Sequence, residues 1–419
     1  MMREMGSPPP APAADASAAP EPGGTDARPA GPLRGVLVAD FSRVLAGPLA
    51  TMVLGDLGAT VVKVEHPHGD DTRRWGPPFA GGEAGGETTY YLSVNRNKRS
   101  VVLDLATEEG LVDAELLARR STVLIENFRP GRLGSFGLGY DELAKHNPAL
   151  VYCSISGFGS AGPGAELVGY DFVVQAMSGL MAITGPVGGP ASKVGVAVVD
   201  VLTGLYAAIG ILAALRERDQ TGKGQRVEVD LLSCALASLV NQASSYLNAG
   251  VVPQALGNRH PSVAPYETLG AADGELAIAC GNDAQFRSLC EVLGIPGAAD
   301  DTRFRTNPER VEHREELVGV LEAQLASRTV SEWVSDIRAV GVACGPVNDV
   351  AAAFAGAEGL GLRAVVSQAW GEGAAASVAS PLRFGTTPVS YRRPPPGLGQ
   401  DGDEVLGWLR SSEGSELPP

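Results

Sequence analysis

Short apolar runs alternate with helical stretches through the first half of this chain, and this alternation restricts the fold more than any other feature. The runs are rich in valine, leucine and isoleucine, which is typical of strands buried on both faces. They lie at residues 34–40, 60–65, 100–105, 122–126, 150–155 and 226–231. Helical patterns lie between them, at 48–57, 108–119, 140–145 and 197–218. Strands joined by helices predict crossover connections, and therefore a parallel sheet with helices on both faces.

The pattern of predicted secondary structure changes near residue 265. Two short strands, 266–269 and 276–279, flank Asp273-Gly274 and predict a hairpin, and helical patterns follow up to residue 340. We therefore predict an α/β fold with a large domain built from 32–229 and 341–419 and a small α/β domain of 230–340. Residues 1–31 are rich in proline, alanine and glycine and have no apolar core of a signal peptide. They are predicted to form a disordered tail.

The net charge and the spacing of the cysteines restrict the expected binding partners and cofactors. The chain has 33 basic and 48 acidic residues, a formal net charge of −15, which disfavours nucleic acid and anionic membranes as partners. We expect no segment to be long and apolar enough to span a membrane. The five cysteines form no CxxC pair and the five histidines form no metal-binding motif. We expect reduced thiols, a cytoplasmic location and no metal or redox cofactor.

Several short phrases occur in a specific order along the chain. They are DFSRVLAGP (40–48), LGA (57–59), KVE (63–65), NRNKRS (95–100), ENFRPG (126–131), SGFG (156–159), GYD (169–171), TGKGQ (221–225), GNRHP (257–261) and CGPV (344–347). In this order and spacing, the chain resembles the class III coenzyme A transferases, the carnitine dehydratase and bile-acid-inducible F group. That group includes formyl-CoA transferase and α-methylacyl-CoA racemase relatives. The resemblance covers about residues 35–400.

The resemblance implies a Rossmann-like large domain, an interlocked homodimer, and an acyl-CoA and a carboxylic acid as substrates. It also implies a set of residues that contact CoA. These are Val44, Leu45, His66, Leu103, Asn127, Phe128, Arg129 and Arg132. Some relatives carry a basic residue at the position of Ala106 and an arginine near Ser135, where this chain has neither. Arg132, Lys98 or Arg99 are the alternatives for the missing positive charge.

Class III transferases use an aspartate whose carboxylate attacks the thioester. The resemblance places that position at Gly188, and a glycine cannot form an acyl anhydride. No acidic residue lies between Asp171 and Asp200 in this chain, so these two aspartates are the candidate replacements.

Three functions stay open at this point. The leading prediction is CoA transfer between an acyl-CoA and a carboxylic acid, with Asp171 or Asp200 as the nucleophile. The first alternative is an acyl-CoA racemase or isomerase that moves the α-proton. The resemblance then gives Asp200 one role, but it puts Tyr170 where that branch has a histidine, and a tyrosine is a poor base at neutral pH. The second alternative is a subunit that binds acyl-CoA without turnover.

Overall fold

The computed structural model describes residues 31–81, 86–411 and 417. Residues 1–30 of the predicted tail therefore lie outside the described residues. The chain divides into two compact units, one made of the described part of Met1–Val168 with Asp200–Asp230 and Arg363–Pro419. The second unit is Gly169–Val199 with Leu231–Leu362. Compared with the predicted domains, the second unit gains residues 169–199 and 341–362, which we had assigned to the large domain.

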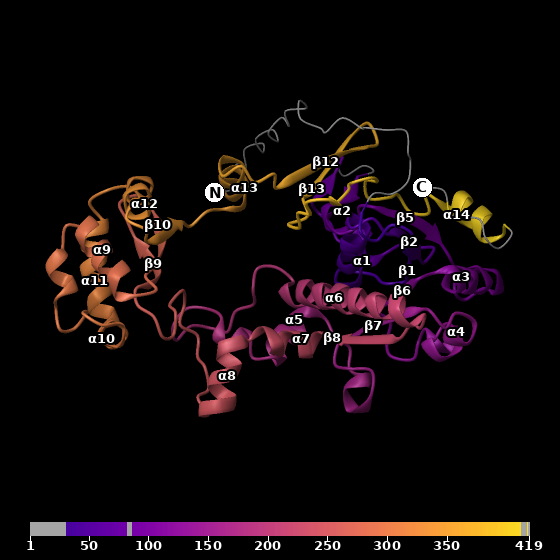
Figure 1. The fold of residues 1–419 in the computed structure, drawn as a ribbon, viewed down its shortest axis with the longest axis horizontal. Coiled ribbons are helices and arrows are strands. Elements are labelled where there is room, and N and C mark those ends of the chain that lie inside the picture. Colours follow the sequence, from indigo (N-terminus) through magenta and orange to yellow (C-terminus); the bar gives the residue numbers. More distant parts are fainter. Residues whose placement is uncertain (1–30, 82–85, 412–416, 418–419) are drawn as a thin grey trace, which may run out of the picture. The chain divides into compact units, whose positions relative to one another are not determined.

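The first unit contains a sheet of six parallel strands (Figure 1), which confirms the predicted fold class. In spatial order the strands are β5 (Lys98–Val102), β2 (Thr60–Glu65), β1 (Leu37–Asp40), β6 (Val123–Glu126), β7 (Val151–Ser156) and β8 (Arg226–Asp230). Counted in chain order within this sheet, they stand 3-2-1-4-5-6, so the order reverses between β1 and β6. In doubly wound sheets, ligands bind beyond the carboxyl ends of the strands at such a reversal.

Helices cover both faces of this sheet. On one face, α3 (Glu108–Arg120), α4 (Tyr140–His146) and α14 (Gly402–Leu409) share an apolar core with the strands. On the other face lie α1 (Ala46–Asp56) and α6 (Val198–Thr221), both of which approach the strands through glycines. A Cβ atom at Gly210 would lie 2.8 Å from Val227 of β8, so a larger residue would push α6 away from the sheet. This helix, rich in alanine and glycine, therefore packs closely on the sheet.

The expectation that no segment is long and apolar enough to span a membrane is wrong for α6. This helix has 24 residues, and an 18-residue window of it reaches a mean hydropathy of 2.1. Of that window, 44% is buried inside the protein. Its buried residues, which include Ala207, Ile211 and Ala214, belong to the core of the first unit, as expected for a central helix of a folded domain.

The second unit has a three-stranded antiparallel sheet, in the order β11 (Ala343–Pro346), β10 (Glu275–Ala279) and β9 (Tyr266–Gly270). The predicted hairpin is thus observed, and β11 is an additional strand. Around this sheet lie α9 (Asp283–Val292), α10 (Asn307–Glu312), α11 (Arg314–Leu325) and α12 (Val330–Ala339). The remaining helices of the unit are α5 (Asp171–Met177), α7 (Leu231–Ser238), α8 (Val240–Ala249) and α13 (Val350–Gly359).

The first unit also has small elements outside the main sheet. These are β3 (Phe79–Ala80), β4 (Glu87–Thr88), α2 (Thr89–Ser93) and a hairpin of β12 (Val365–Trp370) and β13 (Gly373–Val378). The hairpin was not predicted. All five cysteines are free thiols, and four of them are buried, as expected for a chain without disulfides.

Candidate functional site

A pocket of about 250 Å³ opens at the carboxyl ends of the central strands of the first unit. Its walls come from the segments that follow β1, β2, β5 and β6, beside the point where the strand order reverses. Four of the eight predicted CoA contacts line it together: His66, Leu103, Phe128 and Arg132. The rest of the lining includes apolar side chains, Arg43, Lys63 and three acidic residues, Glu65, Asp70 and Asp104. The apolar wall suits a flat base, and the arginines suit phosphates.

The other four predicted contacts do not line this pocket. Val44 and Leu45 belong to the turn beside it. Asn127, which bonds to that turn, and the exposed Arg129 lie on the loop after β6. The pocket instead includes Arg43, whose guanidinium lies 5.9 Å from the ring centre of Phe128 and pairs with Asp71 at 3.2 Å. Arg43 was part of the DFSRVLAGP phrase, but the sequence did not indicate that it faces the pocket.

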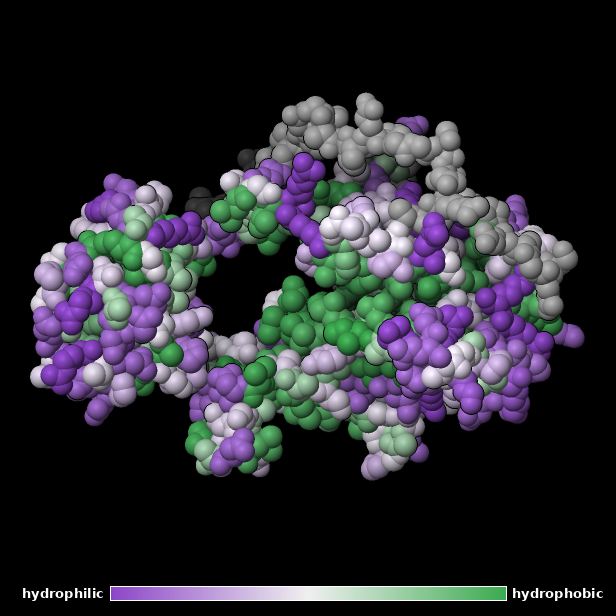
Figure 2. All heavy atoms as spheres, viewed as in Figure 1, coloured by the Kyte–Doolittle hydropathy of each residue, from purple (hydrophilic) through white to green (hydrophobic). Residues whose placement is uncertain are grey.

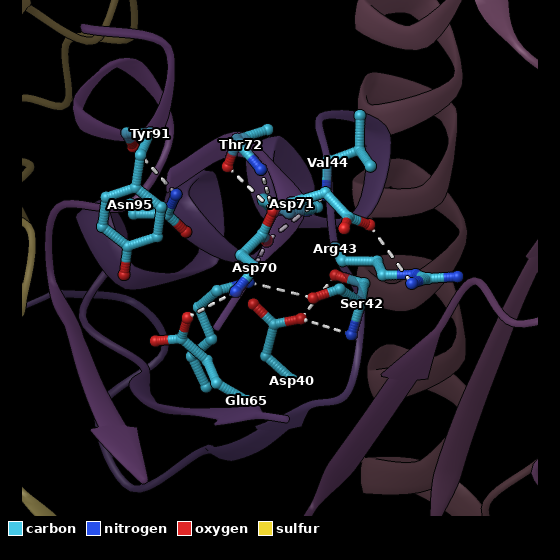
Figure 3. A network of polar contacts seen from close by, with 12 residues as sticks. Asp40, Ser42, Arg43, Val44, Glu65, Asp70, Asp71, Thr72, Tyr91 and Asn95 are labelled. Atoms are coloured by element: carbon cyan, nitrogen blue, oxygen red, sulfur yellow. Dashed lines mark hydrogen bonds and ion pairs between the residues drawn. The ribbon is translucent and has the colours of Figure 1, made fainter. Parts of the chain in front are cut away.

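The turn from Ser42 to Leu45, between β1 and α1, is held by side chains from three different segments. Two of these side chains, Asp40 and Asp70, are labelled in Figure 3. Asp40 accepts a hydrogen bond from the Ser42 amide at 3.0 Å. The amide group of Asn127 accepts from the Arg43 N–H at 3.0 Å and donates to the Arg43 carbonyl at 2.7 Å. Asp70 accepts from the Val44 N–H at 3.3 Å. The backbone of this turn is therefore fixed from three sides.

Buried ion pairs lie directly beneath the turn. Lys98 donates to Asp40 at 3.1 Å, and both side chains are fully buried. Lys63 donates to Asp70 at 2.8 Å and to the Ser42 carbonyl at 3.0 Å. A buried charge needs a partner of opposite sign and further hydrogen bonds to satisfy its remaining sites. These residues therefore form a rigid base for the turn.

The pKa values of these groups follow from their burial and their partners. Burial alone would raise the pKa of Asp40 and Asp70, but the neighbouring lysines outweigh it and lower both. For Asp70 the pKa falls to about 2. Burial lowers the pKa of Lys98 to about 8, against the attraction of Asp40. The acids are therefore ionised throughout the physiological pH range.

The three alternatives for the missing positive charge differ in their position relative to the pocket. Lys98 is fully buried and its ammonium group donates to Asp40, to Asn95 and to the Pro48 carbonyl, so it cannot reach a ligand. Arg99 is almost fully buried and pairs with Glu404. Only Arg132 of the three lines the pocket, with its guanidinium 4.4 Å from the ring centre of Phe136.

Glu126, at the end of β6, is a further titratable group beside the pocket. Only 8% of it is exposed, and it accepts a hydrogen bond from the Phe128 N–H at 2.8 Å. Burial raises its pKa to about 7, although the hydrogen bonds from Phe128 and Ser154 and the charge of Arg226 oppose the shift. Its carboxyl group thus keeps its proton in the folded protein to a higher pH than in the unfolded chain.

Glu126→Gln is expected to change how stability depends on pH. The stabilising effect of protonated Glu126 is complete below pH 4.5, its ordinary pKa, and is lost as pH rises through about 7. The side chain of the variant never ionises. Between pH 5 and 8, its free energy of unfolding should therefore rise relative to that of the wild-type protein, by about 3 kcal/mol at most. Urea unfolding of both proteins at several pH values measures this. The exposed control Glu142→Gln should show no such trend, and a constant difference for Glu126→Gln would contradict the expectation.

The catalytic candidates lie in different parts of the fold. Asp200 is half-buried in the first turn of α6 and belongs to the first unit, together with the pocket. One turn further along α6, a Cβ atom at Gly204 would lie 2.6 Å from the carbonyl oxygen of Ala46, the first residue of α1. The start of α6 therefore lies against the start of α1, beside the Ser42–Leu45 turn.

Asp171 and Gly188 both belong to the second unit. The carboxylate of Asp171 accepts hydrogen bonds from the Val199 N–H at 2.8 Å and from the Gln175 side chain at 2.6 Å. It therefore caps the amino end of α6 and links that end to α5. Gly188 lies in a loop with φ of +67°, and nothing lies within 4 Å of the place where its Cβ would be.

Comparisons with known proteins agree on one family. The model of CoA-transferase family III matches residues 33–402. The succinate–glutarate CoA-transferase of Agrobacterium fabrum is 43% identical over 393 residues, covering 92% of this chain and 98% of the relative. The human succinyl-CoA:glutarate CoA-transferase is 41% identical over 377 residues, covering 90% and 85%. The crystal structure of a CaiB/BaiF family protein from Brucella suis has a TM-score of 0.83 at 42% identity, covering 91% of this chain and all of that chain.

Proposed function

Because this chain belongs to CoA-transferase family III, we propose that it transfers CoA from succinyl-CoA to glutarate or to a similar dicarboxylic acid. Transfer of CoA between an acyl-CoA and a carboxylic acid is the activity named for its relatives. The observation that carries the finer proposal is the 43% identity, over 92% of this chain, to a protein named for succinate and glutarate. These names favour transfer over racemisation and over a subunit without turnover. CoA enters the reaction as a substrate, and no metal or redox cofactor is part of the proposal.

The substrate proposal is tested by initial rates with succinyl-CoA and a panel of acceptor acids. Other relatives are named for oxalate and for mesaconate, so these two acids belong in the panel beside glutarate and a monocarboxylic acid. We expect glutarate to give the highest kcat/KM and the monocarboxylic acid the lowest. A clear preference for a monocarboxylic acid would contradict the proposed substrate class, and hydrolysis without any acceptor would contradict transfer.

We propose Asp200 as the nucleophile, in place of the position at Gly188 that the resemblance indicated. Its support is its half-buried place in the unit that carries the pocket, beside the turn that precedes α1. The first turn of a helix also favours a negatively charged carboxylate. Asp171 is engaged as a cap, and the Gly188 position has no carboxylate at all. In this proposal the chain does not lack its nucleophile.

The proposed reaction proceeds by four nucleophilic acyl substitutions, in each of which a nucleophile attacks a carbonyl carbon and a leaving group departs. The Asp200 carboxylate attacks the thioester carbon, and the CoA thiolate leaves to give a mixed anhydride. The thiolate then attacks the Asp200 carbonyl carbon, which forms an enzyme–CoA thioester and releases the first acid. The acceptor carboxylate attacks this thioester, and CoA leaves again. Finally, the thiolate attacks the new acyl group, which releases the product acyl-CoA and restores the Asp200 carboxylate.

Arg132→Ala is expected to weaken CoA binding about tenfold but to leave binding of 3′-dephospho-CoA almost unchanged, because one charged phosphate contact is lost. Calorimetry with both ligands measures the difference. Arg129→Ala is the matched comparison, since Arg129 is also exposed on this loop but does not line the pocket. It should change both affinities less than twofold. Equal losses for the two ligands with Arg132→Ala would contradict a role in phosphate binding.

A second copy of this chain is the proposed partner. Figure 2 shows apolar side chains gathered over α6, where Leu205, Tyr206 and Ile209 are 42%, 45% and 60% exposed. The second unit exposes further large apolar residues, such as Phe172 and Leu247. Exposed apolar surface of this kind is typical of a protein interface.

The dimer is tested by light scattering. We expect the wild-type protein to have twice the mass of one chain, and Ile209→Glu to shift it towards the monomer, because a charge would be buried in the interface. Glu217→Lys, further along the same helix and also exposed, is the control that should leave the mass unchanged. A monomeric wild-type protein at micromolar concentration would contradict the proposal.

A further inference from the structure

Val44 has a backbone conformation that its side chain opposes. Its φ is +71°, in the left-handed region, where a β-branched residue is a marked exception. Asn97 and Val240 are the other non-glycine residues with positive φ among residues 31–81, 86–411 and 417. Such strain persists only where surrounding contacts impose it, and it often accompanies a functional site.

Those contacts are present around Val44. Side chains bond five backbone groups of three successive residues: the N–H and the carbonyl of Ser42, the N–H and the carbonyl of Arg43, and the N–H of Val44. Asn127 alone holds two of these groups, and Asp70 holds the N–H of the strained residue itself. Asp70 is in turn fixed by Lys63. It also accepts from the amide and hydroxyl of Thr72 (Figure 3).

The Ser42–Leu45 turn leads directly into α1. Its N-cap is Leu45, and among the described residues no side chain caps this end of the helix. The first amides of a helix need acceptors. The start of α1, whose first N–H groups have no side-chain cap, therefore lies next to α6 one turn after Asp200, where the proposed function needs donors for the thioester carbonyl.

We infer that Asn127 and Asp70 are positioning residues for CoA transfer, which hold Val44 in the left-handed conformation so that the start of α1 is ready for the thioester. This inference rests on the proposed function. It also changes the role of Asn127, which the resemblance presents as a CoA contact, because both ends of its side-chain amide are used on the Arg43 backbone. We call the hydrogen bonds from Asn127 and Asp70 to the turn the clamp. Without this clamp, residue 44 relaxes to a negative φ and the start of α1 moves.

The inference is tested by a double-mutant cycle between residues 127 and 44. Asn127→Ala frees the Arg43 backbone groups, which are exposed and can bond to water, so this variant should fold. With Val44 present, it is expected to lower kcat about tenfold and to change KM for the acceptor acid less than twofold. In the Val44→Gly background, where the left-handed conformation needs no clamp, the same substitution should lower kcat less than threefold.

Val44→Ala provides the matched background, because alanine loses the valine methyl groups but keeps the Cβ that opposes positive φ. Asn127→Ala should again lower kcat about tenfold there. Equal losses in all three backgrounds would show that Asn127 contacts the substrate directly, and no loss in any of them would show that the clamp is irrelevant; either result overturns the inference. A wild-type protein that transfers no CoA would be a different result, because it would overturn the proposed function itself.

Asp70→Asn is a second route to the same test. Because it leaves the buried Lys63 without its ionised partner, its folding must be checked by thermal unfolding before the rates are compared. If it folds, its loss of kcat should also shrink in the Val44→Gly background. A loss that is the same with Val44 and with Val44→Gly would count against the inference.

Discussion

Asp200→Ala is expected to reduce the rate of CoA transfer by at least about a thousandfold while CoA binds within about threefold of its wild-type affinity. The reason is that the substitution removes the proposed nucleophile but none of the residues that line the pocket. Steady-state rates with succinyl-CoA and an acceptor acid, together with calorimetry of CoA, measure the two quantities separately. Mass spectrometry of the wild-type protein during turnover should find CoA attached to the peptide that contains Asp200, and the variant should carry no adduct.

Two control variants distinguish Asp200 from the other candidates. Asp171→Asn keeps an oxygen that can accept from the Val199 N–H, so it should lose much less activity than Asp200→Ala. Gly188→Asp should fold, because its Cβ has open space and aspartate tolerates a φ of +67° better than most residues. It should not restore transfer to Asp200→Ala. Restored activity, or an adduct on Asp171, would contradict the assignment of Asp200.

Lys98→Met is expected to destabilise the protein by about 3–5 kcal/mol, the largest effect on stability that we predict. The substitution removes the charged partner of Asp40, which is 0% exposed and would be left as a buried, unpaired carboxylate. Urea unfolding at pH 7 measures the change in the free energy of unfolding. The matched control is Lys145→Met, which breaks an ion pair with Glu142 whose side chains are 61% and 58% exposed, and which should change stability by less than about 1 kcal/mol.

The double substitution Asp40→Asn with Lys98→Met separates the two possible causes. If the destabilisation comes from the unpaired charge of Asp40, neutralising that residue should recover a large part of the loss. If it comes from lost packing around the lysine chain, the double variant should be at least as unstable as Lys98→Met. Similar losses for Lys98→Met and Lys145→Met would contradict the structural importance of the buried pair.

The main sheet could be predicted because its strands are continuous apolar runs between helices. The strand at 60–65 was predicted with the same ends as β2, and the pattern at 226–231 ends one residue beyond β8. Elements outside this pattern were missed for identifiable reasons. The β13 sequence consists largely of glycine and alanine, which have low strand propensity. The helical stretch after β8 is divided into α7 and α8, and Val240 at the start of α8 has a φ of +40°.

The buried ion pairs could not be predicted, because lysine and aspartate are normally exposed and no periodicity shows which of them are buried. Lys98 is therefore one of the alternatives predicted for the missing positive charge. In the structure, its ammonium group instead bonds to Asp40 and to the Pro48 carbonyl beneath the turn. The position of the pocket was easier to anticipate, since the resemblance supplied His66, Leu103, Phe128 and Arg132. The role of Asn127 was not accessible, because it depends on contacts between a side chain and a backbone 84 residues earlier.

The most direct test of this account is a crystal structure of the protein with CoA bound. The account predicts density for the coenzyme in the pocket between Leu103, Phe128 and Arg132, with its sulfur within about 4 Å of the Asp200 carboxylate. CoA bound at another place, or in this pocket with its sulfur directed away from Asp200, would contradict it.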